Sequence, residues 1–271
     1  MDPARLPALL EEVGALARRA GEAILATVHS LGNVEEKADG SPVTRADRAA
    51  NAVLEDGLHA LEPSLVIVSE EGNLEETVRS AGPIYWLVDP LDGTKEFIAG
   101  RPEYTVNVAL VESGVPILGV IQVPVNGRLY LAARGVGARR VDAGAEVPLH
   151  PAAVERPRTA VVSRSHLTPP TEAFLAHLGI AETTPCGSSL KICAVAEGVA
   201  DVYPRFGPTS LWDTAAGTAI ATAAGCAVVD LSGRPLRYDL AEGLTRPGFV
   251  VTAPGGCLEA CRPALTSTTT R

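Results

Sequence analysis

The sequence of residues 84–94 is IYWLVDPLDGT, a short apolar run followed at once by two carboxylates and a hydroxyl. Residues 84–88 are typical of a buried strand, and Gly93 allows the chain to turn sharply after it. Asp89 and Asp92 are therefore expected where this strand ends. Hard divalent cations such as Mg²⁺ take oxygen ligands and are often held by one or two carboxylates. The segment thus predicts a metal site at the end of a strand.

Two other acids follow the same pattern elsewhere in the chain. Residues 65–68 (LVIV) form a second strand-like run, and Glu70 comes shortly after it. Asp213 lies in the segment LWDTAAG, at the expected N-cap of an Ala-rich helix, where Asp is favoured. Taken alone, each acid has a turn or capping role as its alternative. Because all four lie at element ends, we predict that they converge on one or two metal ions. The four are Glu70, Asp89, Asp92 and Asp213.

A helix is predicted over residues 45–61, where apolar residues recur at helical spacing. Residues 39–44 are expected to form the turn that precedes this helix, with Thr44 as the N-cap. Asp47 then falls in the first turn, where the helix dipole favours a carboxylate. A capping arrangement with Thr44 is enough to account for Asp47 from the sequence alone.

Three motifs together resemble the inositol monophosphatase superfamily, whose members are Mg²⁺-dependent, lithium-sensitive phosphatases. The motifs are DPLDGTKEF at residues 89–97, the pair Glu70-Glu71, and WDTAAG at residues 212–217. Within the superfamily, the chain is most similar to the 3'(2'),5'-bisphosphate nucleotidases of the bacterial CysQ type. The segments that carry this similarity are KEF at 95–97, GSSLKIC at 187–193 and DVYPRFGP at 201–208. The resemblance covers about residues 6–251.

The resemblance implies an α/β fold, a layered α/β/α/β/α sandwich of the sugar-phosphatase type. Alternating helix-like and strand-like segments agree with this fold, and the polar, Pro-rich stretch 142–158 is the best candidate for a boundary between two halves. We expect the N-terminal half, residues 1–150, to carry most metal ligands. The C-terminal half, residues 151–271, would supply Asp213 and the residues that recognise the substrate.

The resemblance also implies how the metal ions are held. Glu70, Asp89 and the carbonyl oxygen of Leu91 would hold one Mg²⁺. Asp89, Asp92 and Asp213 would hold a second, so that Asp89 bridges the two ions. Glu70 is expected to reach a third, weaker ion through water.

The catalytic residues that the resemblance implies are Asp47, Thr94 and Glu70. Asp47 would accept a hydrogen bond from Thr94, and Thr94 would orient the attacking water and help to deprotonate it. The backbone N–H groups of Gly93 and Thr94 would contact the scissile phosphate, as helix N-terminal amides can. Asp213 would lie beside the substrate as well as the metal.

A substrate with two phosphates needs a second anion site away from the metal ions. A helix is predicted over residues 190–197, so Ser188 and the first helical amides could accept a phosphate, with added charge from Lys191. Arg205 could form a bidentate contact with the same phosphate. The alternatives are that Ser188 or Ser189 only caps the helix and that Lys191 is a solvated surface residue. Residues 163–166 are a further candidate for the pocket wall, with an ordinary polar loop as the alternative.

The activity implied by the resemblance is hydrolysis of the 3'-phosphate of adenosine 3',5'-bisphosphate to AMP and phosphate, with 3'-phosphoadenylyl sulfate as another substrate. Water activated by metal would attack directly, so no phosphoenzyme is expected. Inositol monophosphatase or fructose-1,6-bisphosphatase activity is the first alternative, because the metal motif is shared across the superfamily. A metal-binding or nucleotide-binding protein without turnover is the second.

Composition limits the class of partner. The 271 residues carry a net charge of −9, which argues against a nucleic-acid binder, since such proteins normally have a basic surface. A small anionic substrate is still compatible, because bound Mg²⁺ reverses the local charge. Five cysteines without a CxxC pair indicate a reduced, cytoplasmic protein, and no apolar stretch is long enough to span a membrane. A homodimer is expected because it is common in similar proteins.

Overall fold

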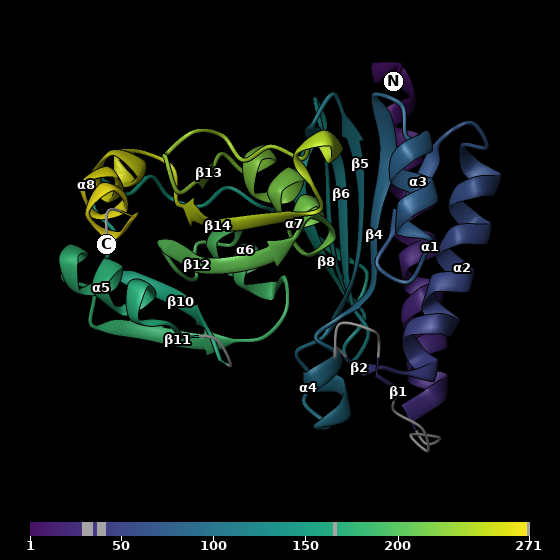
Figure 1. Ribbon diagram of the computed structural model, residues 1–271, viewed down its shortest axis with the longest axis horizontal. Coiled ribbons are helices and arrows are strands. Elements are labelled where there is room, and N and C mark those ends of the chain that lie inside the picture. The colour runs from purple at the N-terminus through teal and green to yellow at the C-terminus, as the bar shows by residue number, and fades with distance from the viewer. Residues whose placement is uncertain (29–34, 37–41, 165–166, 270–271) are drawn as a thin grey trace.

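The computed structural model describes residues 1–28, 35–36, 42–164 and 167–269. Helices and two large β-sheets alternate in five layers, which the ribbon shows from right to left (Figure 1). Two long helices cover the outer face of a seven-stranded sheet, two helices lie between the sheets, and two cover the outer face of a five-stranded sheet. The α/β/α/β/α sandwich expected from the resemblance is therefore confirmed.

The first layer consists of two amphipathic helices that bury one face each against the seven-stranded sheet. They are α1 (Leu6–Thr27), which follows the 3₁₀ turn η1 (Pro3–Arg5), and α2 (Arg45–Leu61). Thr44 is the N-cap of α2, as predicted, and Asp47 completes a capping box with it. Of the turn expected before α2, residues 39–41 lie outside the described residues. The short strands β1 (Glu35–Glu36) and β2 (Pro42–Val43) pair antiparallel.

The seven-stranded sheet has the order β3-β4-β5-β6-β7-β8-β9, so that neighbours in the chain are neighbours in the sheet. Strands β3 and β4 run parallel, and the other neighbouring pairs are antiparallel. The strands are β3 (Val66–Ser69), β4 (Ile84–Asp92), β5 (Thr105–Glu112), β6 (Val115–Val123), β7 (Arg128–Ala133), β8 (Gly137–Asp142) and β9 (Ala145–Pro148). Helices α3 (Leu74–Ser80) and α4 (Thr94–Ile98) precede and follow β4.

The five-stranded sheet mixes parallel and antiparallel pairing in the order β11-β10-β12-β14-β13. Strand β10 is parallel to β11 and β12, whereas β14 is antiparallel to both β12 and β13. The strands are β10 (Thr159–Ser163), β11 (Glu182–Cys186), β12 (Val202–Ser210), β13 (Ala227–Asp230) and β14 (Thr245–Thr252). Helices α5 (Pro169–Leu178) and α8 (Cys257–Thr269) cover its outer face, and the 3₁₀ turn η3 (Leu240–Glu242) precedes β14.

The two inner helices, α6 (Leu190–Ala196) and α7 (Leu211–Ala223), pack between the sheets. Small residues let them approach their neighbours closely. A Cβ on Gly119 of β6 would lie 2.3 Å from the carbonyl oxygen of Ala216, and one on Gly217 would lie 2.7 Å from Cδ1 of Ile192. The Ala-rich sequence of α7 thus allows one helix to pack closely against both sheets. This packing places the first turn of α7 close to β4.

Two expectations from the sequence need correction. The strand predicted over residues 84–88 continues as β4 through Asp92, because pairing with β5 resumes after a bulge between Asp89 and Asp92. Asp213 is not the N-cap of α7, since Ser210 takes that place and Asp213 is the third helical residue. The division of the chain near residue 150 stays a prediction. Within the described ranges, none of the helices has the length and apolar character needed to cross a bilayer.

Candidate active site

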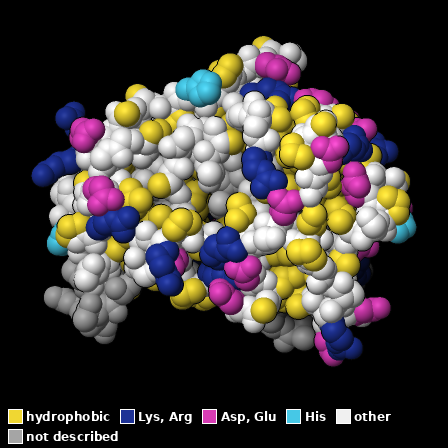
Figure 2. Space-filling model, turned by 90° about the horizontal axis from the view of Figure 1, so that it is seen from above, with side chains coloured by type: hydrophobic (Ala, Val, Ile, Leu, Met, Phe, Trp, Pro, Cys, Tyr) yellow, Lys and Arg dark blue, Asp and Glu magenta, His cyan; other side chains and the backbone are white. Residues whose placement is uncertain are grey.

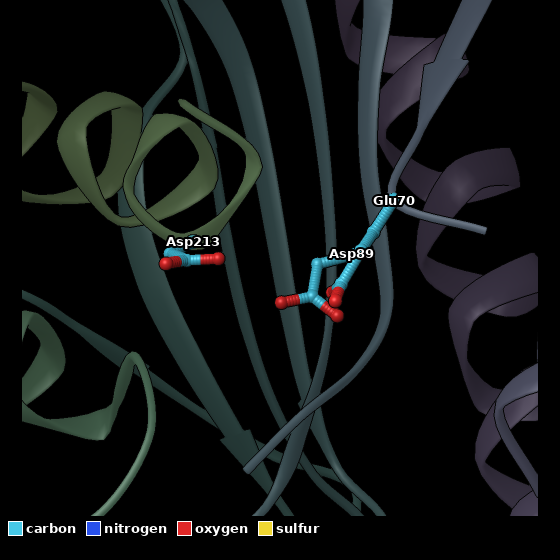
Figure 3. Close-up of side chains that lie close together, drawn as sticks. All are labelled: Glu70, Asp89 and Asp213. Atoms are coloured by element: carbon cyan, nitrogen blue, oxygen red, sulfur yellow. The ribbon is translucent and has the colours of Figure 1, made fainter. Parts of the chain in front are cut away.

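Three of the predicted acids meet between the seven-stranded sheet and the first turn of α7. Glu70 follows β3, Asp89 lies in β4 and Asp213 lies in α7. One carboxylate oxygen of each lies within 4.8 Å of the others. Figure 3 shows the side chains of Glu70 and Asp89 next to each other, with Asp213 facing them across a common space. Parallel pairing of β3 with β4 brings the first two acids to the same sheet edge, and the packing of α7 adds the third.

Local hydrogen bonds fix the direction of two of these carboxylates. Asp89 is 1% exposed, and its Oδ1 accepts a hydrogen bond of 3.0 Å from the amide of Leu91. Asp213 forms a capping box with Ser210, and its Oδ2 accepts from the amide of Ser210 at 3.2 Å and from Thr209 Oγ1 at 3.1 Å. In each case bonds to neighbouring residues leave carboxylate oxygens directed toward the shared space.

Asp92, the fourth predicted acid, lies beside this group but is held differently. Its Oδ2 accepts a hydrogen bond from the amide of Ser189, at the start of α6, and another of 3.4 Å from Nδ2 of Asn107 in β5. It is not part of the set of three whose oxygens lie within 4.8 Å. Its charge nevertheless raises the pKa of both Asp89 and Asp213. The four acids therefore form one electrostatic unit.

Burial and mutual repulsion make this unit unfavourable as a set of four anions. Burial raises the pKa of Asp89 well above its ordinary value, and the charges of Glu70, Asp92 and Asp213 raise it further. Burial likewise raises the pKa of Asp92 to about 6 and that of Asp213 to about 7. A hard divalent cation would remove this repulsion, and carboxylate oxygens are its preferred ligands. The donor set thus fits a divalent metal ion such as Mg²⁺.

Asp47 and Thr94 lie together at the edge of the acidic group. The amide and hydroxyl of Thr44 donate to Asp47 Oδ2 at 2.7 and 2.6 Å, which is the capping role. The other oxygen, Oδ1, lies 3.3 Å from Thr94 Oγ1, which also lies 3.2 Å from the carbonyl oxygen of Leu91. Burial raises the pKa of Asp47, whereas the Thr44 hydrogen bonds lower it. Asp47 therefore caps α2 and contacts Thr94 at the same time.

One pocket contains all the predicted site residues except Asp47. It is lined by Glu70, Asp89, Leu91, Asp92, Gly93, Thr94, Ser188, Lys191, Arg205 and Asp213, among others. Gly93, which has a left-handed φ of 94°, makes the turn between β4 and α4 and faces the backbone of Glu103. Ser163 and Arg164 also line the pocket, as predicted, whereas residues 165–166 lie outside the described residues. Residues from both sheets thus form a single concave surface.

Lys191 is buried, so the interpretation of it as a solvated surface residue is wrong. Its ammonium group donates to the backbone carbonyls of Cys186 and Ser188, and it lies 5.6 Å from the centre of the Tyr203 ring. Burial lowers the pKa of Lys191, while the charge of Asp92 raises it. Ser188, at a left-handed φ of 47°, accepts a hydrogen bond of 3.4 Å from the Leu190 amide, whereas the N-cap of α6 is Ser189, whose side chain makes no capping bond.

An ion pair at the pocket wall has no counterpart in the sequence motifs. Arg164, after β10, contacts Glu103 through two hydrogen bonds, from Nη2 to Oε1 at 2.6 Å and from Nε to Oε2 at 3.1 Å. The amide of Gly187 donates to the same Glu103 Oε2 at 3.0 Å. Glu103 therefore ties the loop before β5 to two segments of the five-stranded sheet. Nothing local in the sequence around Glu103 distinguishes it from an ordinary loop acid.

Comparison with known proteins agrees with the fold. The model of the inositol monophosphatase family matches residues 8–265. A protein of Escherichia coli (strain K12) named 3'(2'),5'-bisphosphate nucleotidase CysQ is 48% identical over 90% of this chain and 99% of its own length. The CysQ of Bacteroides thetaiotaomicron is similar in structure, with a TM-score of 0.77 and 43% identity over 90% of this chain and 97% of its own. An IMPase of Thermotoga maritima has a TM-score of 0.79 and 25% identity, over 96% and 98% of the two chains.

These matches decide the class of the protein. The chain belongs to the inositol monophosphatase family. It is a phosphatase that acts on a small-molecule substrate, and its acidic group of Glu70, Asp89 and Asp213 is where a metal ion would be held.

Proposed function

We propose that this phosphatase removes the 3'-phosphate of adenosine 3',5'-bisphosphate and releases AMP and inorganic phosphate, with 3'-phosphoadenylyl sulfate as a second substrate. The observation that carries the proposal is a single pocket in which converging carboxylates face the cationic side chains of Lys191 and Arg205. Acids that hold metal suit the phosphate to be cleaved, and cations suit a second phosphate. The names of the bacterial relatives support the same substrate class.

The metal ligands in this proposal are the acids at the strand ends and in α7. Glu70, Asp89 and the carbonyl of Leu91 would hold one Mg²⁺, while Asp89, Asp92 and Asp213 would hold a second. A third ion would be reached from Glu70 through water. When bound, such ions lower the pKa of water and neutralise charge on a phosphate.

The residues of the chain itself would prepare the attacking water. A water at Thr94 Oγ1 can donate a proton to that hydroxyl oxygen while the hydroxyl donates its own proton toward Asp47 Oδ1, 3.3 Å away. Because burial raises the pKa of Asp47, its carboxylate is a better proton acceptor than an exposed one. The pocket-lining amides of Gly93 and Thr94 would hold the phosphate oxygens. Attack is direct, with no phosphoenzyme.

The second phosphate would bind where Lys191 and Arg205 reach the pocket. An ammonium group has three N–H donors, and the carbonyls of Cys186 and Ser188 take two of those on Lys191. The third donor is therefore available to an anion. Arg205 is half-buried, and one of its amino groups donates to the carbonyl of Pro208 at 3.1 Å, which holds its guanidinium near the pocket.

Lys191→Met is expected to lower kcat/KM for adenosine 3',5'-bisphosphate about 10- to 100-fold more than for adenosine 3'-monophosphate. The methionine keeps an apolar stem at this buried position but removes a charged hydrogen bond, which contributes about 1.5–3 kcal/mol. Steady-state kinetics on both substrates measure the effect. Lys95→Met is the matched control, because Lys95 lines the same pocket but is exposed. Equal losses on the two substrates would reduce Lys191 to a support for the loop of residues 186–188.

The substrate itself is tested by phosphate release from adenosine 3',5'-bisphosphate and inositol 1-phosphate side by side, with Mg²⁺ and with EDTA. We expect metal-dependent release with a clear preference for the nucleotide. Preference for the inositol phosphate would keep the metal site and discard the second anion pocket. No release from either substrate, or from fructose 1,6-bisphosphate, would favour a binding protein without turnover.

A nucleic-acid polymer is not expected as a partner. On the face drawn in Figure 2, Lys and Arg side chains lie among Asp and Glu side chains and do not gather into one basic patch. A cytoplasmic location and a homodimer stay predictions, which fractionation of cells and light scattering of the purified protein would check.

A further inference from the structure

A buried polar network lies directly behind Asp92. Its members are Thr105 and Asn107 of β5 and Ser189, the residue before α6, and they are 0%, 1% and 3% exposed. Thr105 and Asn107 are two residues apart, so they project from the same face of β5. Polar groups at this depth are costly unless they are hydrogen-bonded, and these three satisfy one another.

The hydrogen bonds of the network fix the orientation of the Asn107 amide. Its Oδ1 lies 3.1 Å from Thr105 Oγ1 and 2.8 Å from Ser189 Oγ, and the two hydroxyl oxygens are 2.9 Å apart. The hydroxyls can donate to the amide oxygen, which leaves the NH₂ group on the other side. That side faces Asp92, whose carboxylate can only accept. The amide is therefore held with Nδ2 toward Asp92 Oδ2, at 3.4 Å.

Both protein donors to Asp92 reach the same oxygen. The Asn107 amide and the backbone amide of Ser189 each donate to Oδ2. Among the described residues, no donor reaches Oδ1 of Asp92, and the side chain lines the pocket. One oxygen is thus occupied by the protein and the other is directed to the ligand space.

Two features indicate that the network serves Asp92 and not only the packing of the layers. Ser189 occupies the N-cap position of α6, yet its hydroxyl makes no capping bond and points instead to Thr105 and Asn107. The β-bulge between Asp89 and Asp92 lies opposite Asn107 and Thr105, and bulges of this kind redirect side chains. At the position of Asp92, α6 therefore lacks a side-chain cap and the pairing of β4 with β5 is irregular.

We propose that Asn107, supported by Thr105 and Ser189, is a positioning residue that holds Asp92 so that it binds metal through a single oxygen, Oδ1. The inference depends on the proposed role of Asp92 as a metal ligand. Residues that donate hydrogen bonds to a metal-binding side chain contribute strongly to metal affinity, because they orient that side chain before the ion binds.

The test is the binding of Mg²⁺ alone, measured by calorimetry, together with the melting temperature of the metal-free protein. Asn107→Ala is expected to weaken Mg²⁺ binding about 10- to 100-fold. Thr105→Val, which keeps the shape and removes one hydroxyl, should weaken it in the same direction, whereas Thr105→Ser should bind as the wild type does. The loss of kcat/KM in Asn107→Ala should shrink as Mg²⁺ is raised.

Thr252→Val is the matched control, because Thr252 is also a fully buried strand threonine and its hydroxyl has no partner in the described part of the chain. It should leave Mg²⁺ affinity unchanged. Wild-type affinity in both Asn107→Ala and Thr105→Val, with weakened binding in Asp92→Asn, would overturn the positioning role and keep the metal site. Wild-type affinity in Asp92→Asn would overturn the proposed ligand set as well. Thr105→Val decides the question if Asn107→Ala does not fold.

Discussion

Asp89→Asn is expected to lower kcat/KM by about 1,000-fold or more and, at the same time, to raise the melting temperature of the metal-free protein by a few degrees. The loss of activity follows because Asp89 is the acid proposed to help hold both ions, and such ions, when bound, contribute several kcal/mol to phosphoryl transfer. The substitution is therefore expected to lower activity and raise the stability of the metal-free protein together.

The gain in stability follows from the electrostatics of the metal-free site. Asp89 is 1% exposed, and burial together with the charges of Glu70, Asp92 and Asp213 raises its pKa far above the ordinary value. In the unfolded chain the carboxyl ionises freely, so at pH 8 folding must either protonate it or bury its charge. Asparagine has the same shape and carries neither cost.

Phosphate release and a thermal melt in EDTA at pH 8 measure the two effects of Asp89→Asn. Asp230→Asn is the matched control, because Asp230 is hydrogen-bonded to Ser232 and Arg234 and these partners lower its pKa. That variant should keep full activity and gain no stability. A metal-free Asp89→Asn protein that melts below the wild type would show that the carboxylate is stabilising without metal, contrary to our account.

Mg²⁺ is expected to stabilise the protein strongly at pH 8 and weakly at pH 5. The pKa of Asp213 is raised from 3.8 to about 7, and that of Asp92 to about 6, in both cases chiefly by burial. Between pH 4 and 7 the metal-free folded state therefore holds protons that the unfolded state releases. Its stability relative to the unfolded state falls as the pH rises through this window.

Metal binding reverses that trend because Mg²⁺ competes with these protons. At a concentration near 100 times the dissociation constant, a ligand stabilises by about 2.7 kcal/mol, or about 4–6 °C for a chain of this size. The difference between melting temperatures in Mg²⁺ and in EDTA should thus be small at pH 5 and reach this range above pH 7.5. Removal of the metal by EDTA should abolish turnover at both pH values.

Differential scanning fluorimetry across the pH range measures the effect of Mg²⁺. Asp213→Asn serves as the comparison, because it removes the group with a pKa of about 7 and should flatten the pH dependence in EDTA. An equal shift by Mg²⁺ at pH 5 and pH 8 would contradict the coupling of metal binding to the buried carboxyls.

Local sequence patterns predicted those elements of the structure that neighbouring residues determine. The 3.6-residue period predicted α2 with its Thr44 cap, and an apolar run followed by acids predicted β4 and the place of Asp89. The error at Asp213 was also local. An Asp before an Ala-rich run suggested an N-cap, but the N-cap is Ser210, three residues earlier, and it forms the capping box with Asp213.

Contacts between distant segments could not be predicted in this way. Lysine is usually a surface residue, yet packing of α6 between the sheets buries Lys191. Its ammonium group donates hydrogen bonds to two backbone carbonyls. Asn107 lies in an apolar strand, where its polarity was the only signal of a special role. The orientation of the Asn107 amide depends on a hydrogen bond from Ser189, which is 82 residues away in the sequence.

The sequence by itself indicated the family through its motifs, and the resemblance to that family implied the layered fold. Local patterns also predicted the places of Glu70 and Asp89 beside strand ends, because strand ends, helix periods and turn glycines depend on neighbouring residues. Tertiary structure alone decided which atoms of those acids face one another. The oxygens of Glu70, Asp89 and Asp213 lie within 4.8 Å because β3 pairs with β4 and α7 packs on β4. The orientation of a side chain at such a site depends on hydrogen bonds to segments far apart in the chain and on packing against them. Local sequence patterns do not predict these contacts.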